Sequence, residues 1–393
     1  MLRFLCLASL VGVLGGCMIE EARPIGKGAS PSLQTRNPSS LLKVADDRTA
    51  GQNRPSEYTY RDPVTGITYR INPGWKIMPR KSLGAMQADG LIQTWTDWSH
   101  QVETRIYECV SPTLAQHQDN IGCQVEPDFI LVGGGAWADY GNGPGALLWE
   151  TRPLDVNLMT WVASSKDHEV TSPHWLHTYA IGLRLKDNNG AYISRSSLVG
   201  SFIWFWGHQT TTLSHAPAES LYYYRPDVAL IDADYFSSGA RLNWNCCGAL
   251  LTQSKVKHYM YEMNTNVAGK DHRYSDPSTI TAYGIGTECD HAAPALRQSS
   301  FIPGFGRLEF KVVDATGGPV ATGVSATLVD AEPEYVVTGA GGESKWTSGS
   351  GRLLFGIKPT GVFSPQFTIY SKDHKVVSGG YNIASIVQVR KAH

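Results

Sequence analysis

The sequence predicts an all-β protein in which three tandem β-sandwich-like repeat domains follow a flexible N-terminal tether. Alternating apolar and polar residues are common, whereas no stretch keeps the i, i+3, i+4, i+7 apolar spacing of a helix over three turns. The chain has 40 Gly and 11 Trp but only 18% charged residues, which is typical of turn-rich β structure. A Lys-Asp-His element also occurs three times.

The Lys-Asp-His element belongs to a longer repeat. The constant offset that carries His168 onto His374 also carries residues 126–185 onto residues 332–391 without a gap. A middle copy, in residues 226–286, needs a few inserted residues. A period of about 100 residues is too long for a solenoid and long enough for a domain core, so we expect three domains. Each copy carries a Gly-Ala/Arg-Leu-Leu segment, at Gly145–Leu148, Gly248–Leu251 and Gly351–Leu354.

Residues 1–17 have the features of an export signal. Arg3 gives a positive start, an apolar stretch runs from Phe4 to Leu14, and two small residues precede a cleavage point. Leu14-Gly15-Gly16-Cys17 resembles the lipobox of bacterial lipoproteins. The resemblance implies that Cys17 receives a diacylglyceryl thioether, that the signal is removed before it, and that the new amino terminus is acylated. The alternative is an ordinary cleaved signal peptide in which Cys17 has no role.

The acylated Cys17 would make the lipid bilayer a partner of the protein. No other apolar run approaches the roughly 18 residues of a spanning helix, so the lipid would be the only anchor. In a Gram-negative source the resemblance implies the outer membrane, because Met18 rather than an aspartate follows the cysteine. We therefore expect an exported protein that is lipid-anchored to the cell envelope, on its periplasmic or its surface face.

A tether and a short β-hairpin region precede the repeats. Residues 18–56 are rich in Ser, Pro, Arg, Asn and Gly and lack a hydrophobic period, which is typical of a flexible linker. Two alternating β-prone runs around the turn Asp62–Gly66 predict the hairpin region, residues 57–83. The β repeats are expected at residues 84–185, 186–290 and 291–393.

The cysteines predict disulfides rather than a metal site. In an oxidising compartment Cys109 pairs with Cys123 across a small loop, and Cys289 pairs with Cys246 or Cys247. The chain has neither a Cys-x-x-Cys nor a His-x3-His pattern, so no metal and no cofactor are expected.

The Lys-Asp-His element, placed at the end of a strand, has two alternative interpretations. Side chains alternate along a strand, so Asp167 would face the core while Lys166 and His168 face a wetter side. In the structural alternative, the aspartate accepts hydrogen bonds from a neighbouring turn. In the functional alternative, each copy presents its lysine and histidine beside a glycine-lined loop, as a shallow site for a polar or anionic ligand, and exposed aromatic rings stack on sugars. The candidate ligand-binding residues are Lys166, Asp167, His168, Lys270, Asp271, His272, Lys372, Asp373, His374, Trp137 and Trp161.

Gly133-Gly134-Gly135 is a poor phosphate-binding loop, because it has neither the Gly-x-Gly-x-x-Gly spacing nor a Gly-Lys-Ser/Thr ending. A bulge or a close backbone crossing explains the glycines better. The alignment places Asp232-Ala233-Asp234 at this position in the middle copy, so we do not expect the glycines in every domain.

Charge and motifs exclude several function classes. With 34 basic and 35 acidic residues, no nucleic-acid partner is expected. The chain has no Gly-x-Ser-x-Gly and no His-Glu-x-x-His, and we expect no catalytic residues. Our leading hypothesis is a surface-tethered bacterial lipoprotein that acts as a multivalent binding or adhesion module, with glycans as the first-choice ligand. The alternatives are a secreted hydrolase with one active repeat and a purely structural envelope protein.

Overall fold

The computed structural model describes residues 90–393 with ten short gaps, together with two three-residue strands. The gaps are residues 142, 155–156, 210–218, 225–232, 244–248, 260–261, 272–277, 290–296, 362–363 and 375. The two strands, β1 (Thr59–Arg61) and β2 (Thr68–Arg70), pair antiparallel, as expected within the hairpin region. The export signal with Cys17, the tether, Cys246, Cys247 and His272 lie outside the described residues.

The all-β prediction is confirmed. In the described part of the chain the regular structure is almost entirely antiparallel strands, and α2 (Arg195–Leu198) is one helical turn. No helix among the described residues is long and apolar enough to cross a membrane.

Each repeat contributes six strands. Repeat 1 has β4 (Val102–Val110), β5 (His117–Gln124), β6 (Ile130–Asp139), β7 (Ala146–Pro153), β8 (Thr160–Asp167) and β9 (Trp175–Leu185), preceded by β3 (Gly90–Thr96). Repeat 2 has β10 (Trp204–Gln209), β11 (Glu219–Tyr224), β12 (Ala233–Asn243), β13 (Leu250–Tyr259), β14 (Glu262–Lys270) and β15 (Thr279–Glu288). Repeat 3 has β17 (Leu308–Thr316), β18 (Val324–Asp330), β19 (Val336–Trp346), β20 (Leu353–Pro359), β21 (Gln366–Lys372) and β22 (Gly380–Lys391), preceded by β16 (Arg297–Gln298).

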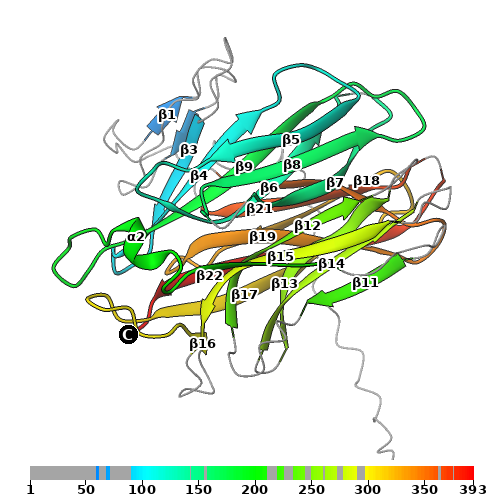
Figure 1. The fold of residues 1–393 in the computed structure, drawn as a ribbon. Helices are drawn as coiled ribbons and strands as arrows, with labels where there is room; N and C mark the ends of the chain where they lie inside the picture. The colour runs from blue at the N-terminus through cyan, green and yellow to red at the C-terminus, as the bar shows by residue number, and fades with distance from the viewer. Residues whose placement is uncertain are drawn as a thin grey trace, which may run out of the picture. The chain divides into compact units, whose positions relative to one another are not determined.

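The sandwich-like repeats share their sheets. Each repeat supplies one three-stranded half to each of two larger sheets. In repeat 1 these halves are β4-β9-β6 and β7-β8-β5, and the other two repeats follow the same order. Each three-stranded half continues into a half from another repeat, because β7 pairs with β12, β13 with β19 and β20 with β6. Figure 1 shows the last of these junctions, where cyan and green strands of repeat 1 lie beside orange and red strands of repeat 3. One buried hydrophobic cluster therefore draws on all three repeats.

The third strand of each repeat carries a β-bulge at the same position. The bulges lie between Leu131 and Gly133 in β6, between Tyr235 and Ser237 in β12, and between Val337 and Gly339 in β19. This register corrects the sequence alignment: the residues of the middle copy at this position are Ser237-Ser238-Gly239, not Asp232-Ala233-Asp234. The alignment failed because the bulges and the insertions of repeat 2 cannot be placed from residue types alone.

The glycines allow close backbone approach, as expected. A Cβ added to Gly133 would lie 3.0 Å from the Cα of Gly339, and a Cβ added to Gly239 would lie 2.8 Å from the Cα of Arg152. Real Cβ atoms do not approach backbone so closely, so these positions exclude a side chain. At each of Gly135, Gly239 and Gly341, the strand that approaches belongs to another repeat.

A second apolar cluster joins the repeats through equivalent leucines. Leu147, Leu250 and Leu353 come from the three Gly-Ala/Arg-Leu-Leu segments, and they pack together with Trp149 and Phe355. Each leucine is the first or second residue of the fourth strand of its repeat. The three repeats therefore contact one another through the leucine at the same position of each repeat.

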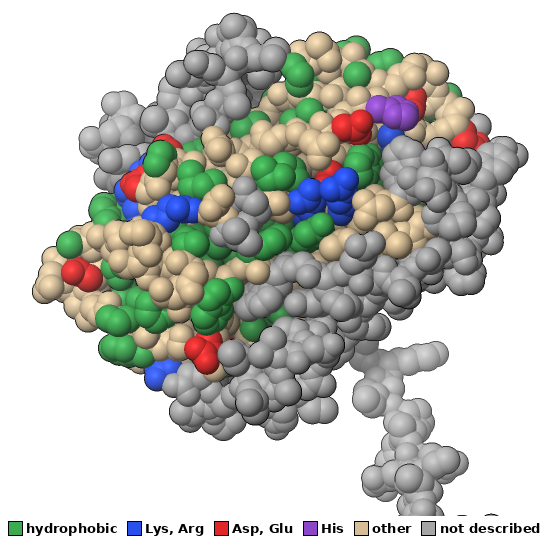
Figure 2. Space-filling model, in the orientation of Figure 1, with side chains coloured by type: hydrophobic (Ala, Val, Ile, Leu, Met, Phe, Trp, Pro, Cys, Tyr) green, Lys and Arg blue, Asp and Glu red, His purple; other side chains and the backbone are tan. Residues whose placement is uncertain are grey.

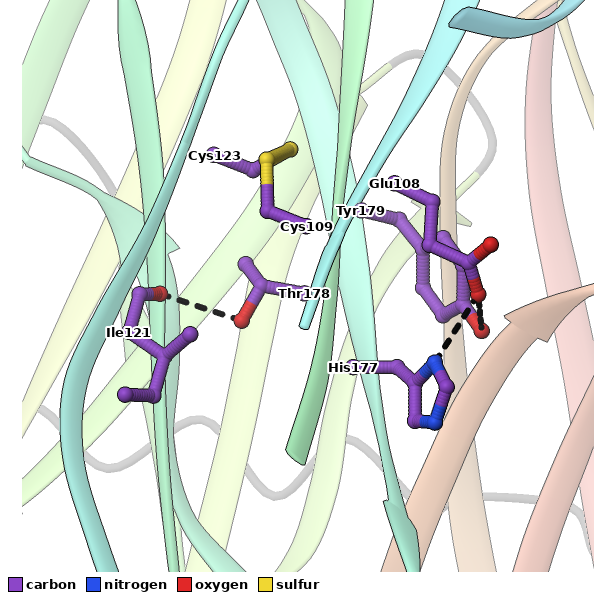
Figure 3. The surroundings of a disulfide bond; sticks show 7 residues. All are labelled: Glu108, Cys109, Ile121, Cys123, His177, Thr178 and Tyr179. Carbon is purple, nitrogen blue, oxygen red and sulfur yellow. Dashed lines mark hydrogen bonds and ion pairs between the residues drawn. A yellow bond between two sulfur atoms is a disulfide. The ribbon is translucent and has the colours of Figure 1, made fainter. Parts of the chain in front are cut away.

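The predicted disulfide between Cys109 and Cys123 is present. It connects β4 to β5 and so connects the two sheets of repeat 1 (Figure 3). The partners predicted for Cys289, Cys246 and Cys247, lie outside the described residues.

A substitution at Gly341 tests the close approach. We expect Gly341→Ala to lower the free energy of unfolding by about 1–3 kcal/mol, the usual cost of overpacking a filled site. The added Cβ would overlap the carbonyl oxygen of Ser254 and lie 2.7 Å from the Cα of Lys255. Urea unfolding measures the change. Gly90→Ala is the control, because its Cβ would meet only the Glu108 carbonyl oxygen, at 3.4 Å; equal destabilisation by both would contradict the prediction.

Candidate functional site

The lysines of the Lys-Asp-His elements do not face solvent. Lys166 is only 3% exposed and Lys270 only 2%, while Lys372 is half-buried. The expectation of a wetter side is therefore wrong for Lys166, and also for His168 and His374, which are 5% and 3% exposed. The physical reason is that the strand ends of repeats 1 and 3 lie against each other, which strand alternation alone does not reveal.

Lys372 of repeat 3 contacts a turn of repeat 1. Its ammonium group donates a hydrogen bond to the carbonyl of Pro144 and lies 4.9 Å from the ring centre of Tyr140. Gly145 has φ +119°, and a Cβ there would lie 2.5 Å from the lysine nitrogen. The glycine thus admits both the backbone conformation and the lysine.

Lys270 of repeat 2 makes the corresponding contact with repeat 3. Its ammonium group lies 5.6 Å from the ring centre of Trp346, and a Cβ at Gly351 would lie 2.9 Å from it. The corresponding glycine of repeat 2, Gly248, lies outside the described residues. The two described contacts link repeat 2 to repeat 3 and repeat 3 to repeat 1.

The histidines of the first and third elements meet each other. The rings of His168 and His374 are both buried, with their centres 5.4 Å apart. The Nε2 atom of His374 donates a hydrogen bond to the main-chain carbonyl of His168. These two residues therefore join repeats 1 and 3.

The aspartates hold nearby turns. Asp373 accepts hydrogen bonds from the hydroxyl of Thr322 at 2.7 Å and from the backbone amides of Gly323 at 2.8 Å and Ser378 at 3.3 Å. Burial alone would raise the pKa of Asp373, but these hydrogen bonds outweigh it and hold the pKa below its usual value.

Asp167 makes similar contacts in repeat 1. It accepts a hydrogen bond from the amide of Ser172 at 3.2 Å, and His117 Nε2 lies 3.2 Å from its carboxylate. Asp271, its counterpart in repeat 2, is buried. The contacts of the two aspartates support the structural alternative for Lys-Asp-His.

The two candidate tryptophans offer little ring surface to a ligand. Trp161 is 1% exposed and donates its indole hydrogen to the hydroxyl of Thr151 at 2.9 Å, so it belongs to the core. Trp137 is half-buried, with the ammonium of Lys358 at 3.4 Å and the ring of His177 at 4.9 Å from its own ring centre.

His177 also belongs to a hydrogen-bonded group, with Glu108 and Tyr179, near the disulfide (Figure 3). Its Nδ1 lies 2.9 Å from the carboxylate of Glu108, which also accepts a hydrogen bond from the hydroxyl of Tyr179 at 3.1 Å (Figure 3). The Glu108 carboxylate thus holds both rings, beside the partly exposed Trp137.

An open pocket of about 630 Å³ lies between repeat 2 and repeat 3. Its walls come from the ends of β13 and β14, from β16 and β17, from the loop before β19, and from β22. Three cations and three carboxylates line it, so their formal charges cancel. The charged lining residues are Arg297, Lys311, Arg390, Glu309, Glu332 and Glu334.

Arg390 is the centre of the pocket's ion pairs. Its guanidinium lies 3.0 Å from Glu309 and also pairs with Glu334, while Lys311 pairs with Glu332. The hydroxyl of Tyr335 donates to Glu309. Burial raises the pKa of Tyr335, and the hydrogen bond to the carboxylate raises it further, so the phenol stays protonated.

The opposite wall of the pocket carries Arg297 and His258. Arg297 pairs with the fully buried Asp234. Burial, and then the charge of Arg297, lowers the pKa of His258, so its imidazole is neutral at pH 7. The wall therefore offers a neutral ring beside a charge that is already paired.

The sequence analysis missed this set of charged residues. The offset that carries His168 onto His374 also carries Glu103 onto Glu309, Arg105 onto Lys311 and Arg184 onto Arg390. The signal for this set in the sequence is that side-chain charge also repeats at the same offset upstream of residue 126.

The pocket can bind a ligand through hydrogen bonds and stacking rather than through net charge. On the face drawn in Figure 2, acidic and basic side chains are interspersed among apolar and neutral ones. Among the described residues, no group of three or more His, Cys, Asp or Glu is arranged to hold a metal ion.

No protein-family model matches this sequence, and no curated protein matches it significantly.

The hydrogen bonds of Asp373 predict acid sensitivity. Because its folded-state pKa is below the unfolded value of 3.8, its stabilisation is complete above that pH and is lost as the pH falls through the folded-state pKa. Asp373→Asn should cost about 1–3 kcal/mol of unfolding free energy at pH 7. Urea unfolding between pH 3 and 7 should show this cost shrinking with acid. The exposed Asp119→Asn is the control, and a cost for Asp373→Asn that does not change with pH would refute the assignment.

Proposed function

We propose that this chain is a lipid-anchored bacterial envelope protein that acts as a binding or adhesion module. The lipobox-like segment ending at Cys17 and the tether of residues 18–56 support the anchor. The open pocket at Arg390 is the observation that carries the binding function, because it gathers hydrogen-bond donors and acceptors on one concave surface.

The pocket's balanced charge favours an uncharged ligand that bears hydroxyl groups. Neither an anion nor a cation gains from a lining whose formal charges cancel, whereas hydroxyl groups bond to both carboxylates and guanidinium groups. Glycans meet this description. Binding through one pocket replaces the three equal Lys-Asp-His sites, because Lys270, Lys372, His168 and His374 contact neighbouring repeats.

A purely structural envelope protein is the second candidate. The contacts that Lys270, Lys372, His168 and His374 make between repeats favour it, since they account for the repeated element without a ligand. The two candidate functions differ in whether the pocket binds a ligand.

The anchor predicts a change of compartment. Cys17→Ser should move the protein from the membrane fraction to the soluble fraction of the envelope, because it removes the acylated residue. Fractionation with mass spectrometry of the mature amino terminus measures this. A wild-type protein without acyl mass at Cys17 would exclude the lipid anchor.

Filling the pocket tests the binding function. Val312 lines the pocket and is half-buried, so Val312→Trp should reduce retention on a glycan array and on isolated envelopes by about tenfold or more. Val324→Trp, at an exposed valine of β18 outside the pocket, is the matched control. The structural candidate expects neither variant to change retention, and that result would exclude the pocket as the binding site.

A further inference from the structure

Repeat 1 carries its own copy of the charged set that lines the pocket. Arg184 lies 2.9 Å from Glu103 and pairs with Asp128, as Arg390 pairs with Glu309 and Glu334. Arg105 pairs with Glu126, as Lys311 pairs with Glu332. The two copies therefore share the same pattern of ion pairs, with Lys311 in place of Arg105 and Glu334 in place of Asp128.

In repeat 1 this set holds a tyrosine side chain. The guanidinium carbon of Arg184 lies 3.6 Å from the ring centre of Tyr192 and 4.6 Å from that of Phe129, so it contacts two rings. The hydroxyl of Tyr192 donates to Oε2 of Glu103 at 3.1 Å. Tyr192 lies outside the strands, in the segment after β9, and remains 47% exposed.

In repeat 3 the hydroxyl of Tyr335 already donates to Oε1 of Glu309, and the difference from repeat 1 lies in the second ring and in Oε2. Arg390 lies 4.8 Å from the ring centre of Tyr335, which stands at the position of Phe129, and no second ring contacts it among the residues that the structure describes. Oε2 of Glu309 accepts from Arg390 at 3.2 Å, whereas Oε2 of Glu103 accepts from both Arg184 and Tyr192. Arg390 and Glu309 both line the open pocket.

We propose that the pocket binds a phenol ring, the side chain of a tyrosine in a protein or peptide partner. The ring stacks on the guanidinium of Arg390 and donates its hydroxyl to Oε2 of Glu309, as Tyr192 does at Arg184 and Glu103. This inference rests on the proposed binding function and replaces the glycan by another uncharged ligand that bears a hydroxyl group. A tyrosine is favoured over a sugar because a planar π system stacks on a guanidinium, and a pyranose has none.

The experiment titrates the full mature protein with N-acetyl-L-tyrosinamide, followed by NMR and calorimetry. N-acetyl-L-phenylalaninamide should bind about tenfold or more weakly, because it lacks the hydroxyl donated to a carboxylate. Methyl α-glucopyranoside is the sugar arm.

Arg390→Lys is the test variant, because it keeps the charge beside Glu309 but removes the flat guanidinium face. It should weaken binding of the tyrosine probe by about threefold or more. The same change at Arg184 is the matched control and should leave the affinity unchanged, since Tyr192 already occupies that set. Glu309→Gln is a second variant if Arg390→Lys does not fold.

The outcomes separate the two proposals. Binding that needs the hydroxyl and weakens at Arg390→Lys supports the tyrosine inference. Binding of the glucoside alone, binding of neither probe, or tyrosine binding that both pocket variants leave unchanged overturns it. The proposed function fails by a different result, namely unchanged envelope retention of Val312→Trp.

Discussion

The fold depends on three places where backbones of different repeats approach so closely that a side chain does not fit. These places are at Gly135, Gly239 and Gly341. The strands that approach the three glycines are β20, β7 and β13, in that order, and each belongs to another repeat. The bulges three residues earlier bend β6, β12 and β19, and a bulge increases the local twist of a strand. The sheets can therefore run from one repeat into another and bury one connected core.

This constraint explains why the repeated Lys-Asp-His element is not a set of exposed sites. The turns that begin β7 and β20 lie against the strand ends of another repeat and so enclose Lys372 and Lys270. A buried ammonium is costly unless it is paired, and Lys372 has a carbonyl oxygen and an aromatic ring as partners. A residue pattern that recurs in every repeat can thus reflect a contact that recurs between repeats.

Function is more easily found where the repeats differ. Repeats 1 and 3 keep the same acid and base pairs, but Tyr192 covers the first and the second remains an open pocket. In repeat 2 the strand register places Trp204 where repeat 1 has Arg105. This member of the charged set is therefore not required in every repeat.

The sequence by itself determined the all-β class, the presence of a repeat, the disulfide between Cys109 and Cys123, and the reason for the glycines of β6. These features follow from local alternation, spacing and the steric needs of single residues. Only the tertiary structure decided which repeat covers Lys270 and Lys372, the register of the middle copy, and the pocket at Arg390. Each of these depends on pairing between strands of different repeats, and residues that are distant along the chain meet only after that pairing is made.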